Sequence, residues 1–189
     1  MSAGDTLPDL LRVGLDVVFV GINPSVYSVQ KGHYFARPGN RFWPCFSLSS
    51  LSKAARRALG VERLEPRHDQ GLLAHGFGFT DVAKRATVGV ADLRPGELAA
   101  GVADLTAKLR NCRPRFACFH GVTGYRHVVR ALGHPDAPAL QLGQQTLCIG
   151  PVCCYVVPNP SGANAHFTRA EQTDWYNRLA QLLQQRTQR

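Results

Sequence analysis

Short apolar runs that alternate with helical segments are the feature that most constrains the fold of this chain. The runs at 16–20 (DVVFV) and 115–119 (RFACF) have the length of buried strands, and each leads into a turn that contains glycine. Segments 98–109 and 124–132 have the apolar spacing of helices. This alternation predicts a layered α/β fold with a largely parallel sheet.

Further elements complete the expected order along the chain. A helix is expected at 47–59, with Asn40 as a possible cap farther upstream, and a short apolar element at 76–80. Segments 146–149 and 153–157 should form a hairpin around Gly150-Pro151. A last helix is expected at 168–183, where Thr168 and Glu171 have the spacing of a capping box.

Composition and length indicate one globular domain over residues 1–189, with residues 1–12 and 184–189 as frayed ends. Hydrophobic residues make up 44% and charged residues 19% of the chain, which excludes a disordered class. We find no apolar run of transmembrane length and no signal peptide, so a cytoplasmic location without membrane contact is the default expectation.

The six cysteines form no CxxC pair, and several lie in apolar runs. We therefore expect reduced, buried thiols and no zinc or iron–sulfur site. The net charge of +9 favours a polyanionic partner, with DNA or RNA as the leading candidate. A solvated cationic surface without such a partner is the alternative.

The ends of the three clearest expected strands lead into GINPS, HGVTG and PNPSGANAH, and the loop TDVAKR lies between the first two of these. Ligands of parallel sheets bind beyond the carboxyl ends of the strands, so these loops are where a site is expected. Asn23 could hold a water or polarise a ligand, or it could simply form a turn with Pro24. Asp81 could be a general base or an electrostatic stabiliser; alternatively it is a helix cap or pairs with Lys84 or Arg85.

The segment 20–43 is unusually long for a strand-to-helix connection. Its aromatic residues could stack on a base, although Phe35 could equally seal the core, as we expect for Phe42 and Trp43. Small residues in the PNPSGANAH loop would let backbone N–H groups approach a phosphate, unless this is an ordinary turn.

Five motifs together resemble the mismatch-specific uracil/thymine DNA glycosylases of the uracil-DNA glycosylase superfamily. They are GINPS, KGHYFARPGNRFW, GFGFTDVAKRAT, LGQQTLCIG and VPNPSGA, in the order and spacing of that family, and the likeness runs from about Leu15 to Leu183. The pairing of GINP with a downstream NPSG is its most specific part.

The resemblance implies a three-layer α/β/α sandwich and a monofunctional enzyme without metal or cofactor. Such an enzyme flips uracil out of G·U mispairs, with G·T mispairs as further candidates, and hydrolyses its N-glycosidic bond to leave an abasic site. It implies that Asn23 orients the attacking water, that Phe35 stacks on the base, and that the backbone of Ile22 and Phe35 reads the uracil edge. Tyr34 and Ser28 are counted with the substrate-binding residues.

DNA contacts follow from the same resemblance. The loop that wedges into the duplex corresponds to Ser161, Gly162, Ala163 and Asn164. Lys31 and His33 are expected to contact DNA, and neither Lys31 nor Lys84 is given a covalent role. The substrate would be damaged or mismatched duplex DNA or a single strand, bound by a monomer.

Three residues depart from the family pattern. Ser25 replaces glycine, and Asp81 replaces lysine or asparagine. Ala163 stands where the bacterial mismatch-specific members carry a leucine wedge and the thymine-active members carry an arginine nearby. Alanine fills a vacated stack poorly, so wedging would be weak or pass to Asn164. A subfamily uses an aspartate catalytically at the position of Asp81, so Asn23 and Asp81 are both catalytic candidates. Two other functions remain open: a glycosylase of the same fold for deaminated purines or alkylated bases, and a non-catalytic damage-binding domain.

Overall fold

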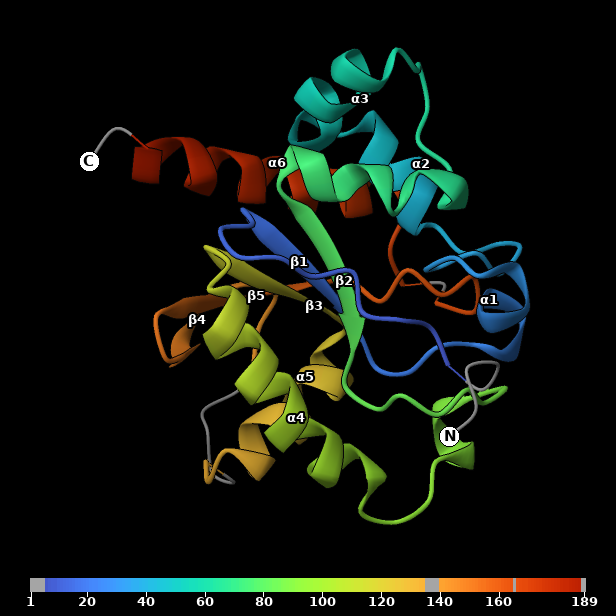
Figure 1. Ribbon diagram of the computed structural model, residues 1–189, viewed down its shortest axis with the longest axis vertical. Helices are drawn as coiled ribbons and strands as arrows, with labels where there is room; N and C mark the ends of the chain where they lie inside the picture. The colour runs from blue at the N-terminus through green and yellow to red at the C-terminus, as the bar shows by residue number, and fades with distance from the viewer. Residues whose placement is uncertain (1–5, 135–139, 165, 188–189) are drawn as a thin grey trace.

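A five-stranded sheet forms the middle layer of the computed structural model, which describes residues 6–134, 140–164 and 166–187 (Figure 1). The strand order is β2-β1-β3-β5-β4, and all neighbours are parallel except β4 and β5. The strands are β1 (Val17–Gly21), β2 (Phe77–Asp81), β3 (Phe116–His120), β4 (Gly143–Ile149) and β5 (Val152–Val157).

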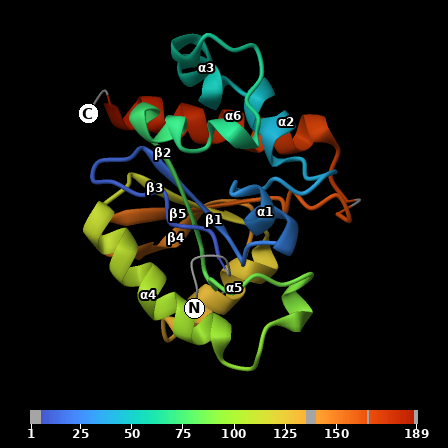
Figure 2. The same ribbon diagram turned by 45° about the vertical axis from the view of Figure 1, so that its right-hand side comes forward.

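Helices cover both faces of this sheet, which gives the predicted α/β/α layering (Figures 1 and 2). Helices α2, α3 and α6 lie on one side, α4 and α5 lie on the other, and α1 lies beside the edge where β1 ends. Their bounds are α1 (Val26–Lys31), α2 (Phe42–Leu48), α3 (Lys53–Leu59), α4 (Glu97–Cys112), α5 (Val122–Ala131) and α6 (Arg169–Thr187). Four short 3-10 turns are η1 (Ser50–Ser52), η2 (Pro66–His68), η3 (Gly71–His75) and η4 (Val90–Asp92).

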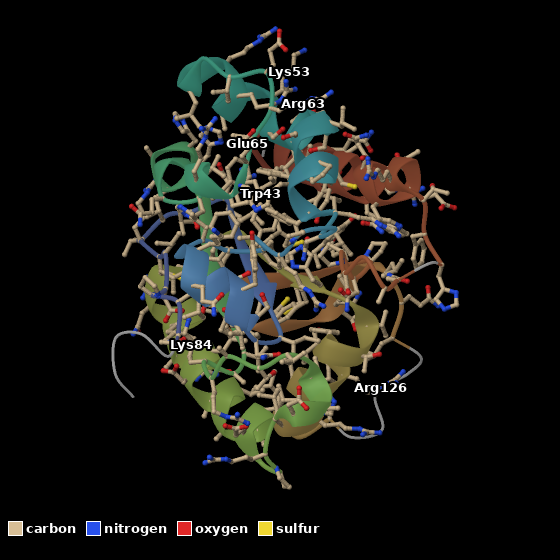
Figure 3. All side chains as sticks on the ribbon, turned by 90° about the vertical axis from the view of Figure 1, so that its right-hand side faces the viewer. Trp43, Lys53, Arg63, Glu65, Lys84 and Arg126 are labelled. Carbon is tan, nitrogen blue, oxygen red and sulfur yellow. The ribbon has the colours of Figure 1, made fainter. Side chains whose placement is uncertain are left out.

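Two apolar cores lie on opposite faces of the sheet because successive strand residues point to opposite sides. In β1, Val17 and Phe19 join the aromatic core under α2 and α6, whereas Val18 and Val20 join the aliphatic core under α4 and α5. Figure 3 places Trp43 of α2 in the interior, while Lys53 and Arg63 lie at the outer surface around α3.

The carboxyl ends of β1, β2, β3 and β5 meet at one edge of the sheet because these strands are parallel. Gly21 is opposite Asp81 in the register, and His120 is opposite Val157. The four loops singled out in the sequence therefore leave the sheet from the same edge. None of the helices in the described part of the chain is long and apolar enough to cross a membrane.

The predicted continuous helix at 47–59 is wrong. Helix α2 ends at Leu48, Ser49 is extended, and a 3-10 turn precedes α3. Serine hydroxyls compete for the backbone there: Ser49 Oγ donates to the carbonyl of Phe46, and Ser52 Oγ donates to that of Ser47.

The described residues at the chain ends are not frayed, because the N-terminal segment is packed and the C-terminal segment is helical. Leu10 exchanges two backbone hydrogen bonds of 2.9 Å with Phe79, and Leu7 is buried. At the other end α6 continues to Thr187. The N-terminal end differs from the prediction because the buried Leu7 and the bridge from Leu10 to Phe79 anchor it to residues far away in the sequence. The rest of the two predicted frayed ends, residues 1–5 and 188–189, lies outside the described residues.

Two local predictions are confirmed. Strands β4 and β5 pair antiparallel around Gly150-Pro151, and the capping box of α6 forms, with Glu171 Oε2 accepting from the Thr168 N–H and Thr168 Oγ1 accepting from the Glu171 N–H. Five of the cysteines are buried and all six are free thiols, but Cys148 is exposed because β4 is an edge strand.

Candidate active site

A pocket of about 260 Å³ opens at the carboxyl edge of the sheet. A volume of this order suits one nucleobase better than a drug-sized ligand. Residues from all four strand-end loops line it, together with residues of the long loop and of the N-terminal segment. They are Leu7, Gly21, Ile22, Asn23, Pro24, Ser25, Ser28, Tyr34, Phe35, Arg37, Asn40, Asp81, Thr87, Val88, Gly89, Val90, His120, Asn159, Pro160 and Ser161.

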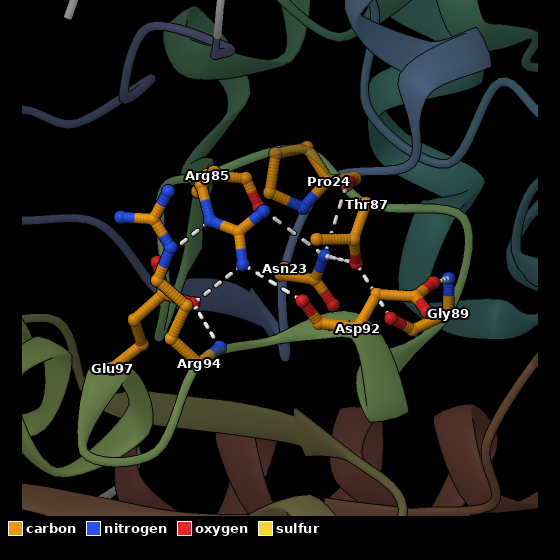
Figure 4. Close-up of polar contacts among 8 residues, drawn as sticks. All are labelled: Asn23, Pro24, Arg85, Thr87, Gly89, Asp92, Arg94 and Glu97. Atoms are coloured by element: carbon orange, nitrogen blue, oxygen red, sulfur yellow. Dashed lines mark hydrogen bonds and ion pairs between the residues drawn. The ribbon is translucent and has the colours of Figure 1, made fainter.

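The amide group of Asn23 is fixed by the loop that follows β2. Its Nδ2 donates to the carbonyl oxygens of Pro24 (3.2 Å) and Arg85 (3.3 Å), and to Thr87 Oγ1 (2.7 Å) (Figure 4). Carbonyl oxygens can only accept, so these contacts decide which end of the amide is nitrogen. The alternative in which Asn23 only shapes a local turn does not account for contacts that reach 62 and 64 residues along the chain.

The Oδ1 atom of Asn23 is the end that remains available. It accepts no hydrogen bond from any residue in the described part of the chain, and Asn23 lines the pocket. A carbonyl oxygen accepts two hydrogen bonds. It can therefore hold a water molecule by one of its protons and leave the water's lone pairs free.

The partners of Asn23 are themselves tied down, as Figure 4 shows. Thr87 Oγ1 donates to the carbonyl of Gly89, and the Arg85 guanidinium makes hydrogen bonds of 2.7 and 2.8 Å to the Glu97 carboxylate. These contacts make the 85–89 loop a rigid support for the Asn23 amide.

Ser25, where the resemblance leads us to expect glycine, is the N-cap residue of α1. Its Oγ accepts from the Ser28 N–H at 3.1 Å and donates to Ser28 Oγ. Serine is a favoured N-cap residue, so the substitution stabilises the start of this helix.

Asp81, the last residue of β2, lies across Gly21 at the floor of the pocket. A methyl group added at Gly21 would come within 2.2 Å of Asp81 Oδ1, so glycine leaves room for the carboxyl in its present conformation. Asp81 is 4% exposed, and its Oδ2 is a buried oxygen without a hydrogen-bond partner among the described residues.

Burial raises the pKa of Asp81 to about 7, because desolvation disfavours the carboxylate. The charges of Lys84 and Lys108 act in the opposite direction, and that of Asp9 reinforces the rise. An acid with a pKa near neutrality can take up or release a proton under physiological conditions.

The simpler explanations of Asp81 as a surface ion-pair partner or helix cap are wrong. Lys84 pairs with Asp9 at 2.7 Å, and Arg85 pairs with Glu97 at 2.7 Å. Asp81 belongs to a strand and begins no helix. Its uncompensated burial therefore has no structural role that we can identify, which favours a chemical one.

Phe35 adopts a backbone conformation that is rare for a bulky residue, with a φ of 53°. Its ring stacks on Phe42 at 4.4 Å between centroids and meets His120 edge-on at 4.8 Å. One face of the half-buried Phe35 ring packs on Phe42, so the other face is available to the pocket that Phe35 lines. This arrangement combines both interpretations of Phe35, because the ring seals the core and can also stack on a base.

Tyr34 and Ser28 both line the pocket, but their polar groups serve the loop. The Tyr34 N–H donates to Asp69 Oδ2, its carbonyl accepts from Trp43 Nε1, and its hydroxyl donates to the Pro8 carbonyl. Ser28 Oγ accepts from the Ala36 N–H at 3.1 Å. The chain is thus pinned on both sides of Phe35, which maintains its strained φ.

The backbone N–H groups of Ile22 and Phe35 donate to no acceptor among the described residues. Both residues line the pocket. Their predicted contact with a base edge stays a prediction, and the two donors needed for it are available.

His120 and Asn159 also line the pocket, and sequence reasoning did not assign them a role. His120 Nδ1 lies 3.2 Å from the Val20 carbonyl, so it carries the proton, and Nε2 accepts from the Tyr176 hydroxyl at 3.1 Å. Burial lowers the pKa of His120 to about 4, so the imidazole that lines this side of the pocket is neutral. The position of His120 and Asn159 directly after apolar runs, at the start of HGVTG and PNPSG, was the sequence signal that could have assigned both residues to the site.

The predicted DNA-binding residues occupy different surroundings. Lys31 is exposed, with its ammonium 5.6 Å from the centre of the Tyr27 ring, whereas His33 Nδ1 lies 3.0 Å from the buried Asp69 carboxylate. Neither lines the pocket. In the NPSG loop, Ser161 lines it, and the exposed Gly162 and Ala163 line an adjoining hollow.

Asn164 is held within its own loop. Its Nδ2 donates to the Asn159 carbonyl at 2.9 Å, and its N–H donates to the Ser161 carbonyl. No cluster of three or more metal-binding side chains occurs among the described residues.

Comparisons with known proteins agree with this architecture. A solution NMR structure of a protein from Methanosarcina acetivorans, provisionally assigned as a uracil DNA glycosylase, matches with a TM-score of 0.56 and 21% identity. The match covers 94% of this chain and 98% of that one, and at this identity it supports the fold. A model of the Uracil DNA glycosylase superfamily matches residues 8–184. The chain therefore belongs to the uracil DNA glycosylase superfamily, whose members are DNA glycosylases and act on DNA.

Proposed function

We propose that this protein excises uracil from G·U mispairs in DNA as a monofunctional glycosylase, with G·T mispairs as further candidate substrates. The observation that carries the proposal is the pairing of a fixed, available acceptor, Asn23 Oδ1, with the buried, unpartnered carboxyl of Asp81 in one base-sized pocket. Flipping costs least for a mispaired base, which favours G·U over A·U.

In the proposed reaction a water held by Asn23 Oδ1 attacks C1′ of the deoxyribose. The N-glycosidic bond breaks, its electron pair leaves with the uracil, and the water contributes its oxygen to the sugar. Asp81, in its carboxylate form, accepts the proton that the water loses and stabilises the positive charge that develops on the sugar. The products are an abasic site and free uracil.

Negative charge on the departing uracil requires donors at its edge. The available N–H groups of Ile22 and Phe35 would supply them, and the ring of Phe35 would stack on the flipped base. No lysine is needed as a nucleophile, in keeping with the ion pair that occupies Lys84.

The direct test is uracil release from a duplex with one G·U pair, followed by alkaline cleavage at the abasic site. The wild type should convert this substrate, and Asn23→Ala and Asp81→Ala should bind the duplex but release far less uracil. Absence of release from every uracil substrate would contradict the proposal. If the wild type binds damaged DNA tightly but releases no uracil, the non-catalytic damage-binding function would replace the proposed glycosylase activity.

The protonation behaviour of Asp81 favours one second candidate, a glycosylase for deaminated purines or alkylated bases. A carboxyl group with a pKa of about 7 can assist hydrolysis when the leaving base is less activated than uracil. A panel of duplexes with uracil, hypoxanthine, xanthine and ethenocytosine separates the two. Faster release of uracil than of the others supports the first proposal.

A further inference from the structure

A second hollow of about 220 Å³ adjoins the base pocket on the side of the NPSG loop. Three residues line both hollows: Arg37, Asn40 and Ser161. Of these, Arg37 alone has a long side chain. It is exposed, and its guanidinium has no partner among the described residues.

The backbone of Arg37 is held in a tight turn. The Asn40 N–H donates to the Arg37 carbonyl at 3.0 Å, with Pro38 and Gly39 between them and a φ of +81° at Gly39. Proline followed by glycine at the two central positions is typical of a type II turn. The base of the Arg37 side chain is therefore fixed, although its end is free to move.

This turn packs directly against the NPSG loop. A methyl group added at Gly162 would lie 2.8 Å from the Gly39 carbonyl oxygen, and the Arg41 N–H donates to the Pro160 carbonyl at 2.8 Å. Arg41 Nη1 also donates to the Phe167 carbonyl beyond the loop. The two loops form one surface at the mouth of the base pocket, and Arg37 stands on it.

Among the described residues 162–164 of the NPSG loop, which belong to the expected wedge, none has a side chain suited to fill the space left by a flipped base. Gly162 has none, the side chain of Ala163 is a single methyl group, and Asn164 is folded back onto the Asn159 carbonyl. An extruded base leaves an unstacked gap that is unfavourable unless another group occupies it. A guanidinium plane can stack on bases and is always charged.

We propose that Arg37 enters the duplex and occupies the gap left by the flipped base, in place of a residue from the NPSG loop. The inference rests on the proposed function, because it requires a base in the pocket. Arg37 is then a positioning residue: it stabilises the extruded state and does not touch the bond that breaks.

The test compares Arg37→Ala with wild type on one sequence in two forms, a G·U duplex and the uracil-containing single strand. Single-turnover release from the duplex should fall about tenfold or more, whereas release from the single strand should stay within about twofold, because no stack has to be refilled there. Arg110→Ala is the matched control, since it removes an exposed arginine beside the Gly150 turn at the opposite edge of the sheet.

A rescue variant tests whether occupancy of the gap is what matters. Ala163→Leu in the Arg37→Ala background should recover most of the duplex activity, since a leucine from the neighbouring loop can fill the same space. An increase in fluorescence of 2-aminopurine placed beside the uracil reports flipping without turnover. Wild type and the rescued protein should show it, and Arg37→Ala should not.

Three results would overturn the proposal. The first is an Arg37→Ala variant that releases uracil from the duplex as fast as wild type, and the second is an equal loss of rate on duplex and single strand, which would indicate a phosphate contact. The third is a 2-aminopurine fluorescence increase in Arg37→Ala that equals the increase in wild type. Failure of the proposed function looks different. In that case wild type releases uracil from neither form, while the fluorescence readout still reports whether Arg37 supports flipping.

Discussion

Asn23 and Asp81 lie at the same sheet edge, but their surroundings are opposite. The amide nitrogen of Asn23 contacts three acceptors from two segments, and those partners are held in turn. The Asp81 carboxyl is buried with an unpartnered oxygen and a pKa raised to about 7. The fixed group can orient a molecule, and the unsatisfied group can change its charge.

This contrast suggests a division of labour that neither residue could manage alone. An amide cannot take up a proton near neutrality, so Asn23 serves only by geometry. A carboxyl with no hydrogen bonds is poorly oriented but strongly responsive to protons.

Asp81→Asn should lower the single-turnover rate of uracil release at pH 8 by about 10²–10⁴-fold, the usual contribution of a general base. The variant keeps the shape of the side chain, so duplex affinity should change little. In wild type the rate should rise with pH and level off above about 7, because the carboxylate is the active form. Rates measured from pH 5 to 9 should show this rise in wild type and none in the variant.

A wild-type rate that falls through the same pH range would instead make Asp81 a general acid. A flat profile in both proteins would remove Asp81 from the chemistry.

Asn23→Ala should lower the rate about 10²–10³-fold, the loss typical for one oriented polar contact at a reacting centre. Since the amide does not titrate, the pH profile of the remaining activity should keep the wild-type shape. Single-turnover rates of the variant from pH 5 to 9 give this comparison. A profile that loses its inflection would show that the two residues do not act separately.

The stability of Asp81→Asn should exceed that of wild type at high pH. The native pKa of Asp81 lies above its unfolded value, so the folded state binds the proton more tightly and ionisation costs stability as pH rises from about 4 to 7. We expect the variant to gain roughly 2–4 kcal/mol in the free energy of unfolding at pH 8 and little at pH 4. Urea denaturation at the two pH values measures the difference; equal gains at both would point to packing instead of charge.

Thr87→Val should have the smallest effect. The substitution keeps the side-chain volume but removes the 2.7 Å contact that helps to fix the Asn23 amide. A loss of about 1 kcal/mol in orientation corresponds to a rate about fivefold lower. Steady-state kinetics should show this in kcat, with KM close to wild type, while Asn23→Ala combined with Thr87→Val should be no slower than Asn23→Ala alone.

The arrangement of the sheet was accessible from the sequence because the strands are short, apolar and followed by turns. The positions of Asn23 and Asp81 followed, since parallel strands bring their carboxyl ends together. The split between α2 and α3 and the packed N-terminal segment were missed, since they depend on serine side chains and on a bridge to Phe79.

The finer features of the site were also beyond sequence reasoning. The Asp81 carboxyl is unpartnered only because Lys84 turns to Asp9 and Arg85 to Glu97, choices that composition does not reveal. Likewise, the strained φ of Phe35 depends on the contacts that hold Tyr34 and Ala36. Long-range contacts decide both.

The close approach of Gly21 and Asp81 has an evolutionary consequence. These positions lie 60 residues apart in the chain but share one small volume, so a side chain at 21 would force the Asp81 carboxyl out of its present position. Exchange of Asp81 for a smaller residue would release position 21 to vary, whereas a lineage that uses the carboxyl in this position is expected to keep the glycine. Relatives that use the aspartate should therefore inherit the two together, and grafting Asp81 into a chain with a side chain at position 21 should displace the carboxyl.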